Sequence, residues 1–189
     1  MSRAYRISVK ESVKRVVRAK DHISTSLEVL DVLPREHMAD LLRRDLEGRG
    51  FKRQGKDMVR TKNGVTVTVE AETGKVTVQA ELEKKVQVEG ERESRVYTDV
   101  GPEGNNAKER LRKELKADLE KQVDDQADKL QKQATDKLEA QLGDLRKELD
   151  QAVNRVTAEA LKQKAASLGT IKEVTEDPQN GSLTIVLEV

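Results

Sequence analysis

Apolar and polar residues alternate along both halves of residues 64–83, GVTVTVEAETGKVTVQAELE, with a polar interruption at 72–75. Pairing Ala71 with Val76 places the apolar residues of both halves on one face of a hairpin, and the Thr, Glu and Gln residues on the other. This pattern requires a loop with an even number of residues, either the two residues Thr73 and Gly74 or a loop of four. The stretch therefore predicts an antiparallel hairpin with one apolar face that needs a cover.

The region before this hairpin predicts more strands and one short helix. Alternation along residues 4–30 predicts strands that are separated by a turn at 19–21. Residues 34–47 begin with Pro and carry an apolar stripe, which predicts an amphipathic helix that covers the sheet. The Asn-Gly pair at 63–64 is typical of a tight hairpin turn. Residues 89–105 are rich in Gly and charge and predict a linker.

A different pattern fills residues 106–168, which contain no Pro and one Gly. Their apolar residues recur with a mean spacing of about 3.75 residues, wider than the about 3.5 of a left-handed coiled coil, and so predict a nearly straight seam. A continuous helix over this segment would be about 95 Å long. We expect either a break at Gly143 or self-association, because so long an apolar stripe is rarely left in water. The stripe consists of Leu111, Leu115, Leu119, Val123, Ala127, Leu130, Ala134, Leu138, Leu142, Leu145, Leu149, Val153 and Val156.

The chain closes with a further hairpin pattern, which we expect to add to a sheet. The fold class is accordingly predicted as α+β: an antiparallel sheet with one short packing helix, a long charged helical arm and a C-terminal β-hairpin. The predicted domains are an α+β domain over 1–103, the helical arm over 104–168 and the hairpin over 169–189.

Composition narrows the functional classes. Charged residues make up 38% of the 189 residues and aromatic residues only 2%, which fits a small aliphatic core with a long solvated helix better than a compact enzyme. The net charge of +1 does not steer the chain toward nucleic acid. The absence of Cys, of a signal-peptide pattern and of an apolar run long enough to span a membrane suggests a cytoplasmic location.

Candidate catalytic groups are few. His22 and His37 are the only histidines, and the pair Asp21-His22 lacks a recognisable third group. A metal site needs three or four converging ligands, and no such set is identifiable. Glycine-rich phosphate loops, GxSxG and HExxH are all missing from the sequence. We therefore expect a non-enzymatic protein without a catalytic, metal or cofactor site.

Two binding surfaces are candidates. The first is the helical seam, which we expect to bind a protein partner or a second copy, with its contact residues being Leu111, Leu115, Leu119, Leu130, Leu138, Leu142 and Leu149. The second is a basic strand face that could bind an anion, formed by Lys10, Lys14, Arg15 and Arg18. The alternative function is therefore a nucleic-acid or anionic-surface binding module, although interleaved aromatic residues, which single-stranded nucleic acids stack on, are missing.

A family resemblance supports the interpretation that the helical seam binds a protein partner. The segment HISTSLEVLDVLPREHMADLLRRDLEGRGF, followed by GVTVTVEAETGKVTVQAE, resembles a small accessory X domain of bacterial FtsH ternary systems. In these systems an FtsH-like AAA+ ATPase, a MoxR-type ATPase and a von Willebrand A protein are thought to act together. The C-terminal segment, from RVTAEALKQKAASLG to NGSLTIVLEV, is similar to the end of a conserved plastid and cyanobacterial family of unknown function. The first resemblance implies an adaptor that works beside AAA+ ATPases in a bacterial conflict or stress system.

Overall fold

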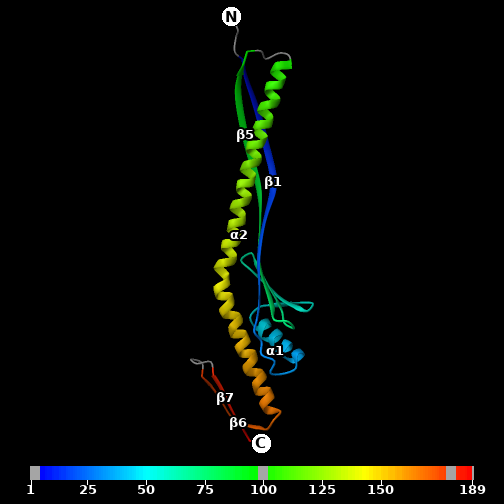
Figure 1. Cartoon of the computed structure of the whole chain (residues 1–189), viewed down its shortest axis with the longest axis vertical. Coiled ribbons are helices and arrows are strands. Elements are labelled where there is room, and N and C mark those ends of the chain that lie inside the picture. Colours follow the sequence, from blue (N-terminus) through cyan, green and yellow to red (C-terminus); the bar gives the residue numbers. More distant parts are fainter. Residues whose placement is uncertain (1–4, 98–101, 178–181, 189) are drawn as a thin grey trace. The chain divides into compact units, whose positions relative to one another are not determined.

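The computed structural model describes residues 5–97, 102–177 and 182–188, and it confirms the α+β class (Figure 1). One sheet has five strands in the order β1-β5-β4-β3-β2, and the other pairs β6 with β7. The elements in chain order are β1 Tyr5–Ser26, α1 Arg35–Gly48, β2 Lys52–Gln54, β3 Asp57–Lys62, β4 Val65–Glu70, β5 Lys75–Val96, α2 Pro102–Ala166, β6 Thr170–Asp177 and β7 Ser182–Glu188.

Two compact units share the long elements. The first, here called the ribbon unit, combines the chain up to Lys20 with Glu81–Thr135, and the second, the sheet unit, combines Asp21–Ala80 with the chain from Asp136 onward. Strands β1 and β5 and helix α2 each contribute one part to each unit. The three domains predicted in chain order stay a prediction. Each of the two compact units instead combines two segments that are distant in the sequence.

The ribbon unit is a two-stranded ribbon with one face against helix α2 (Figure 1). Cross-strand ion pairs between Arg6 and Glu93 and between Arg18 and Glu83 place the two strands antiparallel. The apolar face of the ribbon meets the helical seam because inward residues repeat every second position on the strands and every three or four positions on the helix. The cluster that joins them contains Val9, Leu115 and Leu119, with Val13, Val88 and Leu111 packed against it.

Strand β1 is continuous, so the predicted turn at 19–21 is wrong. Val17 and Ala19 are both buried on the helix side, and the inward positions of β1 keep odd numbers throughout. A turn could have moved the inward residues from odd to even positions. Because the inward positions stay odd across Ala19, the sequence pattern is that of one continuous strand. The predicted linker at 89–105 is also wrong over its first half, because β5 continues to Val96. Helix α2 then begins at Pro102, where a missing N–H costs little.

Helix α2 runs unbroken through Gly143, so the break expected there does not occur. A Cβ at this glycine would meet nothing within 4 Å, which places it on an open side of the helix. The cost is therefore that of an exposed helical glycine, about 1 kcal/mol. Leu138, Leu145 and Leu149 are buried on either side of Gly143, and each contributes more than this by leaving water.

The turns of the sheet unit follow the sequence in part. Asn63 and Gly64 have φ values of 54° and 80°, which confirms the tight turn between β3 and β4. Val76 pairs with Val69 and not with Ala71, so the predicted register is wrong by two residues and the loop has four residues. A shift of two keeps all valines on the same face, and β-branched Thr73 disfavours the tighter primed turn.

Helices cover the apolar face of the five-stranded sheet. The stripe of α1 is buried at Met38, Leu42 and Leu46, as its sequence predicts. Helix α2 covers the same face as well, because Arg60, on an inward position of β3, bonds to Glu148 of α2. The C-terminal hairpin forms a sheet of its own, which corrects the expectation that it extends another sheet. Most of the turn expected within it lies outside the described residues.

Candidate functional site

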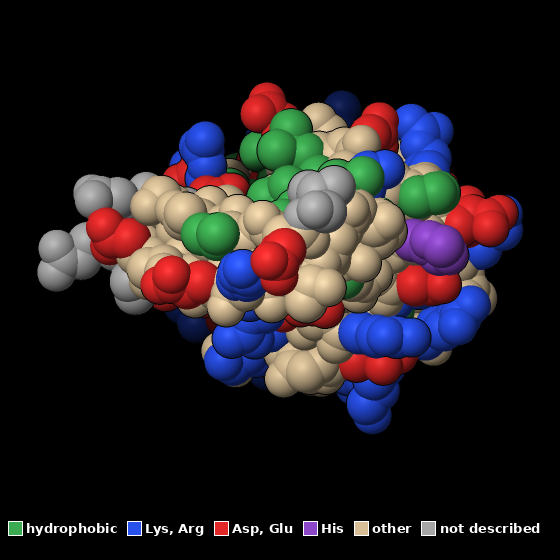
Figure 2. All heavy atoms as spheres, turned by 90° about the horizontal axis from the view of Figure 1, so that it is seen from below, with side chains coloured by type: hydrophobic (Ala, Val, Ile, Leu, Met, Phe, Trp, Pro, Cys, Tyr) green, Lys and Arg blue, Asp and Glu red, His purple; other side chains and the backbone are tan. Residues whose placement is uncertain are grey.

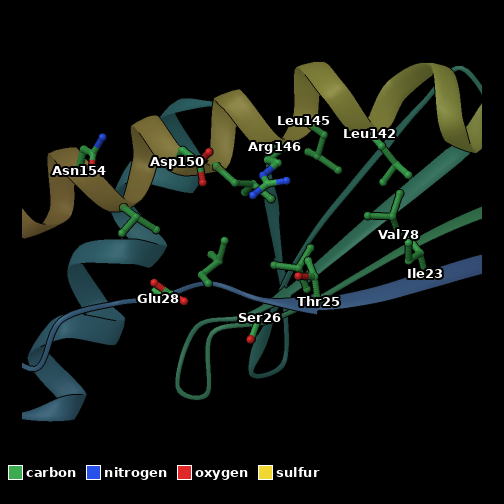
Figure 3. Close-up of a pocket in the computed structure, with 14 residues that line it drawn as sticks. Ile23, Thr25, Ser26, Glu28, Val78, Leu142, Leu145, Arg146, Asp150 and Asn154 are labelled. Atoms are coloured by element: carbon green, nitrogen blue, oxygen red, sulfur yellow. The ribbon is translucent and has the colours of Figure 1, made fainter. Parts of the chain in front are cut away.

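The sheet unit contains an apolar groove of about 870 Å³ between α2 and the strands β1 and β5 (Figure 3). Helix α2 lies on one side, and Leu142 and Leu145 point from it toward the strand residues Val78 and Ile23. The chain segment that carries Ser26 and Glu28 closes the other side. The apolar lining consists of Ile23, Leu27, Val76, Val78, Leu142, Leu145, Leu149 and Val153.

Local periodicity places these side chains together. Ile23 and Thr25 occupy odd positions of β1, and Val76 and Val78 occupy even positions of β5. The apolar helix residues lie three or four apart on α2. The side chains at the floor of the groove are buried, since Val76 is 0% and Leu149 is 3% exposed. Ile23 is 44% exposed and lies at the mouth of the groove. The groove can therefore accept apolar side chains that enter past Ile23.

The rim carries charges of both signs. Glu28, Arg146 and Asp150 line the groove beside its apolar residues, together with Thr25 and Asn154. Figure 2, which views the molecule from below the orientation of Figure 1, shows the same mixture on that face, with Lys and Arg side chains interspersed with Asp and Glu and apolar side chains exposed between them. Among the described residues, no three His, Cys, Asp or Glu side chains converge in a way that could hold a metal ion. The groove therefore offers apolar contact with a polar border.

An ion pair fixes helix α2 against β3 in the same unit. Arg60 Nη1 and Nη2 donate to the two carboxylate oxygens of Glu148 at 2.6 and 2.7 Å. The guanidinium also donates to the Arg49 carbonyl at 2.9 Å and lies 4.3 Å from the centre of the Phe51 ring. The hydrogen bond from Arg60 lowers the pKa of Glu148, and the Glu148 carboxylate raises the pKa of Arg60. Such a two-pronged pair is strong and directional.

The leucines predicted to bind a partner are mostly covered by the chain's own strands. In the ribbon unit, Leu115 and Leu119 pack against Val9 and are 4% and 1% exposed. In the sheet unit, Leu142 and Leu149 line the groove. Of the remaining three, Leu130 and Leu138 are buried, and Leu111 packs beside the ribbon cluster. Burial of this seam needs no partner, and its role in binding stays a prediction.

Sequence reasoning did not identify the strand side of the groove. Ile23 and Leu27 were interpreted only as strand residues, and Leu27 lies just after the end of β1. A large aliphatic side chain at such a half-covered position is a signal for a contact. Tertiary packing determines where along α2 a groove remains beside the sheet. The periodic spacing of apolar residues does not indicate this position.

The predicted anion-binding residues do not form one basic site. Three of the four face carboxylates in the ribbon unit, and Lys14 is exposed on the outer strand face. The pairs are Lys10–Glu91 at 3.2 Å, Arg18–Glu83 at 2.8 Å and Arg15–Asp124 at 3.8 Å. The Ser8 hydroxyl, which donates to Glu91 at 2.7 Å, and Lys10 together lower the pKa of Glu91. These partners compete with any bound anion, and the anion-binding role stays a prediction.

The two histidines lie on different elements. His22 is exposed on β1, and its backbone N–H donates to Asp21 Oδ1 at 2.8 Å. His37 is exposed in the first turn of α1. The Asp21 oxygen therefore accepts from the backbone of its neighbour within the continuous strand β1.

Comparison with known protein families matches the entire sequence, residues 1–189, to the FtsH ternary system domain X5. The chain belongs to this family. The family is an accessory domain of the FtsH ternary system, which confirms the resemblance of the N-terminal half. The similarity of the C-terminal segment to a plastid family stays a prediction. The chain matches no curated protein and no solved structure. Neither helix in the described part of the chain has the length and apolar character needed to cross a membrane.

Proposed function

We propose that this chain is a non-enzymatic adaptor of an FtsH ternary system. It binds an apolar segment of a partner protein of that system in the groove between α2 and the strands β1 and β5. The observation that carries the proposal is the groove itself, which has an apolar floor, a charged rim and an exposed isoleucine at its mouth. Protein interfaces commonly combine an apolar centre with a polar border.

The lining favours a protein segment over a small molecule. The volume of about 870 Å³ has room for several aliphatic side chains. Sites for small molecules usually place a few polar groups where they converge on the ligand. Here the floor residues Val76, Val78, Leu145 and Leu149 are all aliphatic, and the charged residues belong to the rim. An amphipathic helix or strand would satisfy both parts of the groove.

Binding to the three expected partners tests the proposal. The FtsH-like ATPase, the MoxR-type ATPase and the von Willebrand A protein of the same system are purified, and each is titrated with the wild-type chain by biolayer interferometry. Ile23→Glu and Val153→Glu place a carboxylate at the groove, where the partner would have to bury it. We expect each variant to weaken binding about tenfold or more.

Leu168→Glu is the matched control, because it introduces the same charge at a residue of the sheet unit that is 60% exposed and outside the groove. Circular dichroism establishes that all three variants stay folded. The proposal is wrong if the wild-type chain binds none of the three proteins, or if both groove variants bind as tightly as the control.

A further inference from the structure

Among the residues that the structure describes, the ribbon unit has two long strand edges without a backbone partner. Over Arg6–Lys20, β1 pairs with β5 alone, and over Glu81–Val96, β5 pairs with β1 alone. The pairing of β4 with β5 ends at Val65 and Ala80, before this part of β5 begins. Unpaired N–H and C=O groups along an edge can add another strand. Within the described residues, only the Lys20 end is partly covered, since Gln131 donates to its carbonyl at 3.2 Å.

The exposed faces of the two strands carry opposite charge. The outward residues of β1 in this unit include five basic and no acidic side chains, namely Arg6, Lys10, Lys14, Arg18 and Lys20. The outward residues of β5 include five glutamates, interrupted by Lys85 and Arg95, namely Glu81, Glu83, Glu89, Glu91 and Glu93. Arg6, Lys10 and Arg18 already pair with β5 glutamates of the same copy. Lys14 and Lys20 on β1, and Glu81 and Glu89 on β5, have no ion pair among the described residues, so they are the charges that can attract a strand with the character of the other.

The chain already shows how such strands combine. Within one copy, Arg6 bonds to Glu93 at 3.3 Å and Lys10 to Glu91 at 3.2 Å, across the same pair of strands. Two β1 edges placed side by side would bring lysines and arginines together, and two β5 edges would bring glutamates together. Like charges opposite one another destabilise strand pairing, whereas opposite charges stabilise it. The mixed arrangement is the favourable one.

We propose that copies of this chain associate edge to edge, with the free edge of β1 in one copy adding to the free edge of β5 in the next. The occupant of each edge is thus a second copy of the same chain. Because this contact joins two different surfaces, it repeats from copy to copy and produces either a closed ring or an open filament. It involves the ribbon unit and is independent of the groove in the sheet unit, so the two proposals can fail separately.

Sedimentation velocity of the full chain tests the proposal directly. Wild type is expected to form species larger than a dimer by roughly 100 µM, and these are expected to dissociate as the salt concentration rises to about 0.5 M. Lys14→Glu and Glu89→Lys reverse one charge on each edge, and neither residue has an ion pair among the described residues. We expect each variant to assemble about tenfold more weakly than wild type.

Mixing the two variants provides the decisive measurement. The reversed β1 edge of one variant matches the reversed β5 edge of the other, and their unchanged edges also match, so an equimolar mixture is expected to assemble like wild type. Lys129→Glu, an exposed position on the helix of the same unit, is the matched control and is expected to leave assembly unchanged. Circular dichroism checks that each variant retains its helix content.

Several outcomes would overturn the proposal. They are a wild-type chain that stays monomeric, a closed dimer that Lys14→Glu does not weaken, a mixture no larger than its separate components, or an equal loss in the Lys129→Glu control. If a charge reversal unfolds the ribbon, Lys14→Gln and Glu89→Gln replace it. Each must then weaken assembly more than Lys129→Gln does for the proposal to stand.

Discussion

Removal of one charge should reveal how strongly helix α2 is fixed to the sheet. Glu148→Gln keeps the size of the side chain but loses the carboxylate that receives both nitrogens of Arg60. The arginine keeps its hydrogen bond to the Arg49 carbonyl and its place beside Phe51. The substitution therefore removes the ion pair with little change in packing, and the remaining guanidinium is left without its main partner.

The loss in the free energy of unfolding expected for Glu148→Gln lies between the values for an exposed and a buried ion pair. Exposed ion pairs contribute about 0.2–1 kcal/mol, and breaking a buried pair costs about 3–5 kcal/mol. The Arg60 and Glu148 side chains are 20% and 28% exposed, so solvent screens the pair in part. We expect Glu148→Gln to lower the free energy of unfolding by about 1–2 kcal/mol. For a chain of this size, that corresponds to a fall in Tm of about 2–8 °C.

The pH dependence provides an independent check. The hydrogen bond from Arg60 lowers the pKa of Glu148 below its ordinary value of 4.5. The stabilisation is thus complete above the pKa of the unfolded chain and is lost as the pH falls through the lower pKa of the folded chain. The difference between wild type and Glu148→Gln should be largest near about pH 7 and should shrink toward about pH 3.5.

Urea unfolding followed by circular dichroism measures both quantities, because helix α2 contributes a large signal. The carboxylates other than Glu148 are present in both proteins, so their titration cancels to first order in the difference. A stability loss below about 0.3 kcal/mol at neutral pH would show that the pair contributes as little as an exposed one. A loss that stays constant into the acid range would show that the carboxylate charge is not its cause.

Two further substitutions test the packing of α2. Gly90→Val should lower the free energy of unfolding by about 1–3 kcal/mol in urea titrations. Even a Cβ at Gly90 would lie 2.9 Å from Leu115 Cδ1, so the larger valine side chain would overpack the contact. An unchanged free energy of unfolding would mean that the helix does not approach the ribbon this closely. Gly143→Ala should raise the same quantity by about 0.5–1 kcal/mol, because its Cβ meets nothing and alanine is the better helix former; a loss of stability would show that a helix break at this position is required.

Much of the fold could be predicted from local patterns. Alternation along residues 65–82 predicts the strands, and the Asn63-Gly64 pair predicts their preceding turn. The spacing of leucines predicts a long helical arm, although this spacing leaves its continuity through Gly143 open. These features depend on chain geometry over a few residues, so they are readable without knowledge of the partners. The errors came where a local pattern was compatible with two outcomes, as for the loop of two or four residues at Thr73.

Other features depend on segments far apart in the chain, which a single periodic pattern cannot bring together. The helical seam looked like a surface for another protein, but Leu115 and Leu119 pack on strands of the same chain. The basic residues of β1 looked available for an anion, but Glu83 and Glu91 lie across the ribbon from them. Periodicity defines which face of an element is apolar or charged, whereas long-range packing determines what that face contacts, because burial and charge pairing depend on distance in space and not on separation in sequence.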